Sequence, residues 1–406
     1  MGQLTLVKET MLPVELQYRD SRHETLPHVC HMSGGRSSAM MTLELARNGQ
    51  LNPNRGDVVL FANTSAEHPA TYDFSTLVCD EIESYGIPCF WYEFCTVETF
   101  TRRRWVRQGV YRLVQRHKSR PYDNPAAPGY SDDGKVFEEL ISWRKQMPNR
   151  RSRSCTQHLK MRPGALLLEE WFSGSEGPRH AGHEEGGVFH VDYPQGCVGE
   201  PQYAYRECPP QRVSQLWSDF SVVSNAPVQE GSGIWGLWKS KFYEYVSILG
   251  LRYDEPKRVA RMQEDSLFSE GANGYKCRNR FHPPGEYKYT PLSTSYVTVH
   301  DVNKFWRGQP YDLRVNGRSN CVYCFMKGAK EIDRLHKEPD EEAEVGKPSD
   351  ISWWVDIENK YANPSQQFDD GGKFGFLGLT TTYERVRDGN LGAIHQKDNV
   401  PCACTD

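Results

Sequence analysis

The stretch Cys30–Met41, "CHMSGGRSSAMM", decides the expected fold. It joins "HVCHM" (28–32), which is short and apolar like a buried strand, to "SSAMMTLELARNG" (37–49), whose apolar residues recur at helical spacing. Glycines between a strand and a helix let the backbone approach an anion, and the first amides of the helix point at it. A turn capped by Ser37 or Ser38 fits the same residues, so the stretch alone leaves both interpretations open.

Two more strand and helix patterns follow the glycine loop. "GDVVLFANT" (56–64) and "IPCFWYEF" (87–94) have the composition of buried strands, and "ATYDFSTLVCDEIESYG" (70–86) has that of a helix. This β-α-β-α-β order predicts an α/β fold, a doubly wound parallel sheet with helices on both faces.

Composition shifts along the chain predict its organisation. We expect an N-terminal arm (1–27), a main α/β domain (28–335) with loop-rich insertions near 98–150 and 172–235, and a C-terminal extension (336–406). The net charge of −4 argues against binding of nucleic acid by overall charge. The N-terminus lacks the pattern of a signal peptide and no long apolar run occurs, so we expect a soluble cytoplasmic protein with no membrane contact.

Five stretches together resemble one known family. In chain order they are "SGGRSS" (33–38), "LFANTSAEHPATYDF" (60–74), "SCTQHLKMRP" (154–163), "LGLRYDEPKRV" (249–259) and "NCVYCFMKG" (320–328). The set is similar to the phosphoadenylyl-sulfate reductase-like branch of the PP-loop, or adenine nucleotide alpha-hydrolase, superfamily, of the type found on phage genomes. The resemblance covers about residues 28–330.

The resemblance implies an adenine nucleotide, usually ATP, at the carboxyl edge of the parallel strands. The residues it implies for nucleotide binding are Ser33, Gly34, Gly35, Arg36, Ser37, Ser38, Asn63, Thr64, Glu67, Gly250, Arg252 and Arg258. Arg252 and Arg258 also suit an anion by their planar guanidinium groups, although pairing with Asp254 and Glu255 is the alternative. Many members have Asp where this chain has Ser37, and an Asp there would help to hold Mg²⁺. Cleavage of the nucleotide therefore stays open.

The 12 cysteines indicate metal or thiol chemistry. Cys321 and Cys324 form a C-x-x-C pair that suits one metal ion or cluster, and Cys155 is the expected third ligand. The resemblance implies a [4Fe–4S] cluster, with zinc or a plain pair of buried thiols as the alternatives. Cys277 is the first candidate for a fourth ligand.

Cys402 and Cys404 near the C-terminus are candidates for a catalytic nucleophile or for cluster ligands. A frayed tail with inert thiols is the alternative. Lys160 and Lys327 lie close in sequence to the predicted ligands and are expected to supply cations there.

The segment 101–120 contains eight Lys and Arg residues and no acid, with Trp105 and Tyr111 between them. This pattern is typical of nucleic-acid contact with stacking aromatics, and residues 144–162 would extend it toward Cys155. A helix that buries its valines and exposes its arginines is the alternative.

These features favour a sulfur-transfer enzyme. The loop would hold ATP, an acceptor (nucleic acid by the basic segments) would be adenylated, and a cluster, a cysteine or a thiol or sulfur donor protein would deliver sulfur. A sulfonucleotide reductase that makes sulfite and a non-catalytic nucleotide-binding component of a larger assembly are the competing hypotheses.

Overall fold

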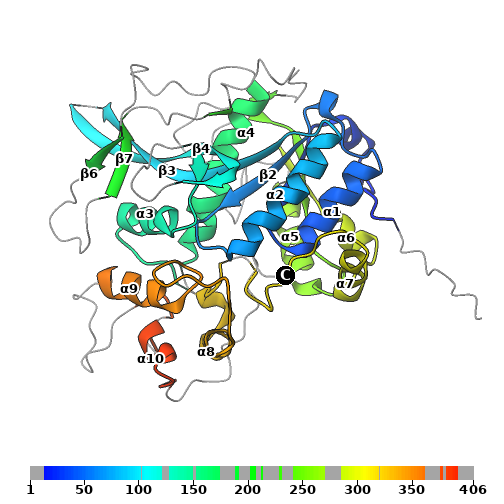
Figure 1. Ribbon diagram of the computed structural model, residues 1–406. Helices are drawn as coiled ribbons and strands as arrows, with labels where there is room; N and C mark the ends of the chain where they lie inside the picture. The colour runs from blue at the N-terminus through cyan, green and yellow to red at the C-terminus, as the bar shows by residue number, and fades with distance from the viewer. Residues whose placement is uncertain are drawn as a thin grey trace, which may run out of the picture.

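The computed structural model confirms the α/β class, with a mostly parallel central sheet flanked by helices (Figure 1). It describes residues 13–101, 103–120, 128–149, 152–173, 188–191, 202–206, 212–213, 228–230, 241–269, 285–319, 321–361, 375–377 and 381–391. The described strands are β1 (His28–Met32), β2 (Val58–Asn63), β3 (Cys89–Thr101), β4 (Arg104–Ser119), β5 (Gly129–Tyr130), β6 (Val188–Val191), β7 (Gln202–Arg206), β8 (Val228–Glu230), β9 (Lys241–Tyr243), β10 (Tyr245–Leu249) and β11 (Glu286–Tyr289).

Helices alternate with strands in the first part of the chain, and the last helices follow β11 one after another. The described helices are α1 (Arg36–Arg47), α2 (Pro69–Ser84), α3 (Lys135–Arg144), the π-helix η3 (Thr156–Met161), α4 (Arg162–Ser173), α5 (Pro256–Ser269), α6 (Pro291–Thr294), α7 (Val299–Arg307), α8 (Ala329–Lys337), α9 (Ile351–Tyr361) and α10 (Tyr383–Arg387). Short 3₁₀ turns are η1 (Ser21–Thr25), η2 (Pro53–Arg55) and η5 (Phe325–Lys327). No helix in the described residues is long and apolar enough to cross a membrane.

The order of strands in the sheet is β11-β10-β1-β2-β3-β4-β5. From β1 the chain moves through α1 to β2 and through α2 to β3, and each of these strands is parallel to its neighbour. It later returns to the other side of β1, where β10 and β11 add in parallel. The direction of winding therefore reverses at β1, between β2 and β10.

Alternate residues of the strands face opposite sides of the sheet. One side packs against α1, α2 and α7, and its strand residues include Cys30, Met32, Val59, Phe61 and Trp91. The other side packs against α4, and its strand residues include Val29, Val58, Leu60, Phe90 and Tyr92. Both faces are apolar because both are covered, as expected for a parallel sheet.

Residues 98–120 differ from the expected insertion and belong to the sheet. β3 runs on to Thr101, and β4 returns antiparallel beside it, from Arg104 opposite Thr101 to Val114 opposite Trp91. The helical alternative for 101–120 is wrong. Val106, Val110 and Val114 lie four residues apart, which places them on one face of a strand as well as of a helix, so the spacing does not distinguish the two.

The C-terminal helices share a core with the C-x-x-C segment. Val322, Phe325 and Ile332 pack with α3, α9 and α10 in one apolar cluster. Trp354 and Tyr383 stack within it at 5.5 Å between ring centroids. This second core lies beyond the carboxyl edge of β2 and β3 and holds the cysteine segment against the sheet (Figure 1).

Gly34 is the residue on which the loop after β1 depends. Its φ is +83°, and a Cβ added there would lie 2.8 Å from Cγ2 of Thr71 and 3.0 Å from the ring of Phe61. Any side chain at position 34 therefore strains the backbone and collides with α2 and β2.

We expect Gly34→Ala to destabilise the protein more than Gly49→Ala does. Gly49 also has a positive φ, +66°, but nothing lies within 4 Å of its added Cβ. Both variants are destabilised because alanine disfavours a positive φ, and Gly34→Ala is further destabilised by overpacking, which costs about 1–3 kcal/mol. Urea unfolding of the two variants measures the difference, and equal midpoints would contradict the assigned contact.

Candidate functional site

The glycine loop and the loop after β10 meet at the point where the sheet reverses its winding. Ser38 lies so close to Gly250 that a Cβ on Gly250 would come within 2.7 Å of the Ser38 Cα. Arg252 donates from Nη1 to Oγ of the buried Ser37 at 2.9 Å. Ligands of doubly wound folds bind at such a reversal, outside the carboxyl ends of the strands.

The start of α1 offers its amides rather than a capped end. Gly35 is the N-cap, and it makes no side-chain cap bond. The expected cap by Ser37 or Ser38 is wrong, because both residues are already helical and Ser38 Oγ donates back to the Gly35 carbonyl at 3.1 Å. Among the described residues nothing accepts from the amides of Arg36, Ser37 or Ser38. The first turn of α1 therefore keeps the donors that an anion needs.

The predicted phosphate-binding cations already have acidic neighbours. Arg36 pairs with Asp312 at 2.9 Å and donates to Asn303 at 2.7 Å. Arg252 pairs with Asp254 at 2.9 Å.

Arg258 pairs with Glu255. The guanidinium groups of Arg252 and Arg258 thus face the acids that the alternative named, although Arg252 is buried rather than solvated.

A second group of predicted residues meets at the end of β2. Thr64 Oγ1 donates to the buried Glu67 at 2.8 Å and lies 3.3 Å from the Cys321 Sγ. Glu67 and Cys321 form an antiparallel β-bridge, and the Val322 amide donates to the Ala66 carbonyl at 3.0 Å. This backbone pairing brings the C-x-x-C segment to the strand end next to the glycine loop.

Cys155 and Lys160 reach the same group from η3. Burial raises the pKa of Glu67, and the Lys160 ammonium lowers it. Burial also raises the pKa of the Cys321 thiol, with the Glu67 carboxylate adding to the rise, Lys160 opposing it and Cys155 close enough to contribute. The structure therefore gathers two thiols, a carboxylate and an ammonium that the sequence analysis had named separately. The wide π turn that places them is a local feature common at functional sites.

The described residues do not by themselves assemble the predicted cluster or metal site. They contain no group of three or more His, Cys, Asp and Glu side chains placed to hold a metal ion. Cys277, Cys402 and Cys404 lie outside the described residues.

Lys327 supports the cysteine loop rather than reaching the strand ends. Its ammonium donates to the carbonyls of Gly317, Ser319 and Val322 at 2.6, 3.2 and 2.9 Å. These bonds tie the turn that contains Cys321 and Cys324 into one unit, so we assign Lys327 a structural part in the geometry.

Asn63 and a buried charge network lie under the same edge. Asn63 donates from Nδ2 to Glu93 at 2.7 Å and to the Ser131 carbonyl at 2.7 Å. Glu93 also pairs with Arg112 at 3.3 Å and Arg120 at 3.2 Å. Asn63 is therefore used by the fold. The sequence analysis missed Glu93, although a lone acid inside the apolar run "CFWYEF" was its signal.

Several arginines of 101–120 form ion pairs within the protein and so help to stabilise the fold. Arg107 pairs with Glu139 at 3.7 Å, and Arg116 pairs with Asp80 at 2.6 Å. Tyr111, expected as a stacking aromatic, is buried and bonds to Glu170. These side chains point into the protein, so the strand offers fewer groups to nucleic acid than its composition predicts.

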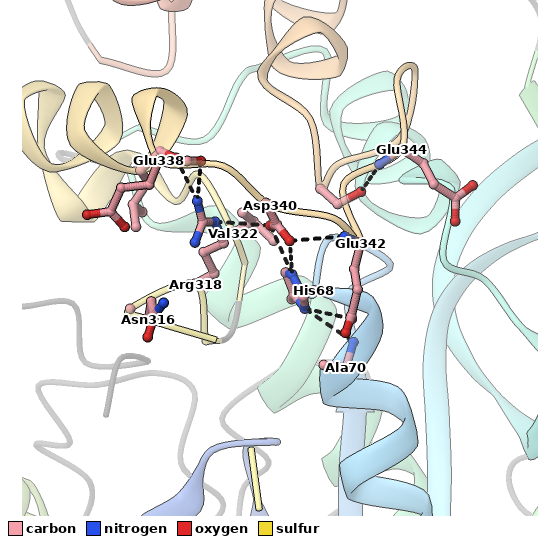
Figure 2. Close-up of polar contacts among 12 residues, drawn as sticks. His68, Ala70, Asn316, Arg318, Val322, Glu338, Asp340, Glu342 and Glu344 are labelled. Carbon is pink, nitrogen blue, oxygen red and sulfur yellow. Dashed lines mark hydrogen bonds and ion pairs between the residues drawn. The ribbon is translucent and has the colours of Figure 1, made fainter. Parts of the chain in front are cut away.

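The acidic stretch 336–350 is held to the start of α2 by two carboxylates, those of Asp340 and Glu342, which both pair with His68 (Figure 2). Asp340 lies 3.0 Å from His68 Nε2 and 3.1 Å from Arg318 Nε. His68 also caps α2, because its Nδ1 accepts from the Ala70 amide at 3.2 Å. Arg318, which is buried, donates to the carbonyls of Leu335 and Glu338 as well.

We expect Asp340→Asn to destabilise the protein by about 2–4 kcal/mol, because it leaves the buried Arg318 without its charge partner. The control variant Asp388→Asn removes a pair with Arg387 in which the Asp388 side chain is 54% exposed, and such a pair is worth about 0–1 kcal/mol. Guanidinium unfolding of both variants is the measurement. Equal losses would show that Asp340 is no more than a surface contact.

Glu93 makes stability depend on pH. Burial raises its pKa to about 7, with Arg112 opposing the rise. The folded chain therefore holds a proton that an unfolded Glu, with pKa about 4.3, releases, so this contribution is complete below about pH 4 and is lost as pH rises through 7.

We expect the wild type to lose on the order of 3 kcal/mol relative to Glu93→Gln between about pH 4 and pH 8. The exposed Glu341→Gln is the control, and its curve runs parallel to that of the wild type. The measurement is the free energy of unfolding of the wild type and of both variants across this pH range. Parallel curves for Glu93→Gln would mean that Glu93 is ionised throughout.

Comparison of the chain with known proteins identifies no relative. No protein-family model matches the chain, and neither a curated protein nor a solved structure matches it at a significant level.

Proposed function

We propose that this chain is an enzyme that binds an adenine nucleotide at the carboxyl ends of β1 and β10 and uses it for sulfur transfer. One observation carries the proposal. The uncapped start of α1 lies at the reversal of the sheet, beside Gly250, and next to the strand end that holds Thr64, Glu67 and Cys321.

The loop would hold the phosphates through backbone donors. The amides of the first turn of α1 carry the positive end of the helix dipole. Ser33 and Ser38 exchange a hydrogen bond between their hydroxyls at 3.0 Å, so both lie at this end of the helix. Gly34 and Gly250 allow the loop to pack closely against α2, β2 and the start of α1, which fixes the position of these amides.

The thiol group lies at the neighbouring strand end, since Met32 of β1 pairs with Phe61 of β2. In the proposed reaction an acceptor oxygen attacks the α-phosphorus of ATP and pyrophosphate leaves. A sulfur nucleophile then displaces AMP from the activated acceptor. Lys160 is suited to neutralise negative charge that develops near Cys321, because its ammonium group already lowers the pKa of Cys321 and of Glu67.

Two other hypotheses can be distinguished from sulfur transfer by experiment. A sulfonucleotide reductase would need a nucleophile such as Cys402 or Cys404, and a non-catalytic component would bind nucleotide without turnover. The [4Fe–4S] cluster or zinc, Mg²⁺, a sulfur donor protein and a nucleic-acid acceptor remain proposals that the mechanism above does not use.

We expect Gly250→Ala to weaken ATP binding about tenfold or more, because its Cβ pushes against the Ser38 backbone and displaces the start of α1. Gly308→Ala is the control, since its added Cβ only approaches the Phe305 carbonyl at 3.4 Å. Isothermal titration with ATP compares the two. Equal affinities would place the nucleotide elsewhere.

The enzymatic part is tested by turnover. Full-length protein with ATP, sulfide and a nucleic-acid acceptor is expected to release pyrophosphate and to place sulfur on the acceptor. Cys321→Ser is expected to release pyrophosphate without placing sulfur on the acceptor. Binding of ATP with no pyrophosphate under any acceptor would favour the non-catalytic hypothesis. Release of sulfite from adenylyl sulfate would favour the reductase.

A further inference from the structure

Two buried polar atoms lie without partners on the helical segment that carries Cys155. Ser154 Oγ and His158 Nδ1 have no hydrogen-bond partner within the described residues. Ser154 is 4% exposed and His158 7% exposed. Four residues apart on a helical segment, they lie on one side of it. Buried polar groups are nearly always paired, so two orphans side by side indicate a missing ligand.

Two guanidinium groups share this place. Arg162 stands one further turn along the same row, and Arg144 arrives from the end of α3 beside Trp143. The Trp143 ring meets the His158 ring edge-on at 5.3 Å between centroids, and Arg144 Cζ lies 5.8 Å from the Trp143 centroid.

The fold holds these cations together against their repulsion. Burial lowers the pKa of His158 to about 4, and the charges of Arg144 and Arg162 add to the shift. Burial likewise lowers the pKa of Arg162, and Arg144 adds to it. An anion between these groups would relieve both the burial and the repulsion.

We propose that Ser154, His158, Arg144 and Arg162 form a binding site for a phosphate group. The hydroxyl and the imidazole N–H donate to single oxygens, and the guanidinium groups supply the paired donors that suit phosphate. The site is separate from the loop after β1 and does not rest on the proposed function.

Its position gives the site a use. Lys160 and Cys155 lie on the same helical segment and reach the group around Cys321. A phosphate held at His158 would therefore anchor a substrate whose reacting part lies near the thiols. The phosphate is that of a free nucleotide or that of a polynucleotide backbone, which share this chemistry.

The test follows the His158 ring by NMR in the full-length protein, with Tris chloride of equal ionic strength as the reference. The probe is inorganic phosphate, and His158→Gln assigns the signal. We expect phosphate to raise the pKa of His158 from about 4 toward its ordinary value, because a bound anion favours the imidazolium. A His158 titration that phosphate leaves unmoved would overturn the proposal.

Variants separate the site from general charge. Arg144→Gln is expected to weaken phosphate binding about tenfold or more, as loss of a charged hydrogen-bond donor does. Arg144→Lys, which keeps the charge, recovers part of the affinity and guards against a folding defect. The control Arg314→Gln removes an arginine whose side chain is 86% exposed and leaves binding unchanged. Equal weakening by Arg144→Gln and Arg314→Gln would also overturn the site.

Competition identifies the source of the phosphate. AMP that displaces inorganic phosphate from His158, in the Gly250→Ala background as well, indicates a free nucleotide. A single-stranded oligonucleotide that does so at lower concentration than AMP, with steep salt dependence, indicates a nucleic-acid backbone. Failure of ATP binding at Gly250 would leave this result unaffected.

Discussion

The close packing of two glycines, Gly34 and Gly250, at the ends of β1 and β10 is the constraint on which the rest of the site depends. Gly34 packs on Thr71 and Phe61, and Gly250 packs on the Cα of Ser38, with no room for a Cβ at either glycine. These contacts fix where α1 begins relative to β2 and β10. Since α1 begins without a side-chain cap, the same contacts also fix where its free amides point. One local steric requirement thus sets both the packing of the sheet and the place for an anion.

The fold class followed from local patterns because the first half of the sheet is built from local units. β1, α1, β2 and α2 follow one another along the chain, and each is bounded by a glycine or by a change of period. The strand β4 was not predicted from the sequence, because its composition is basic and its valines recur every four residues. The acids that neutralise its arginines, such as Glu139 and Asp80, come from helices distant in sequence. A charge pattern read along one strand does not reveal such partners.

The candidate site shows the same division. The resemblance named Thr64, Glu67, Cys155, Lys160 and Cys321 individually, and the structure gathers them through a β-bridge and a π turn. Neither device has a sequence signature. Glu93 was missed because a lone acid in an apolar run signals a buried group but not its partners, and its burial with Arg112 and Arg120 makes it a main electrostatic feature under the site. Asn63, in turn, was named for a ligand but is used by the fold.

Charge balance then decides how an anion would be held at each end of the site. At the loop after β1 the nearby guanidinium groups of Arg36 and Arg252 face Asp312 and Asp254, so their charge is already offset and backbone amides must supply most of the attraction. At His158 the cations instead repel one another, and the attraction there would come from side-chain charge. Binding through fixed amides depends weakly on salt, whereas binding through charged side chains depends on it strongly. A substrate that reaches both the loop after β1 and the His158 site would therefore be positioned by the loop amides and selected for its charge by the cations near His158.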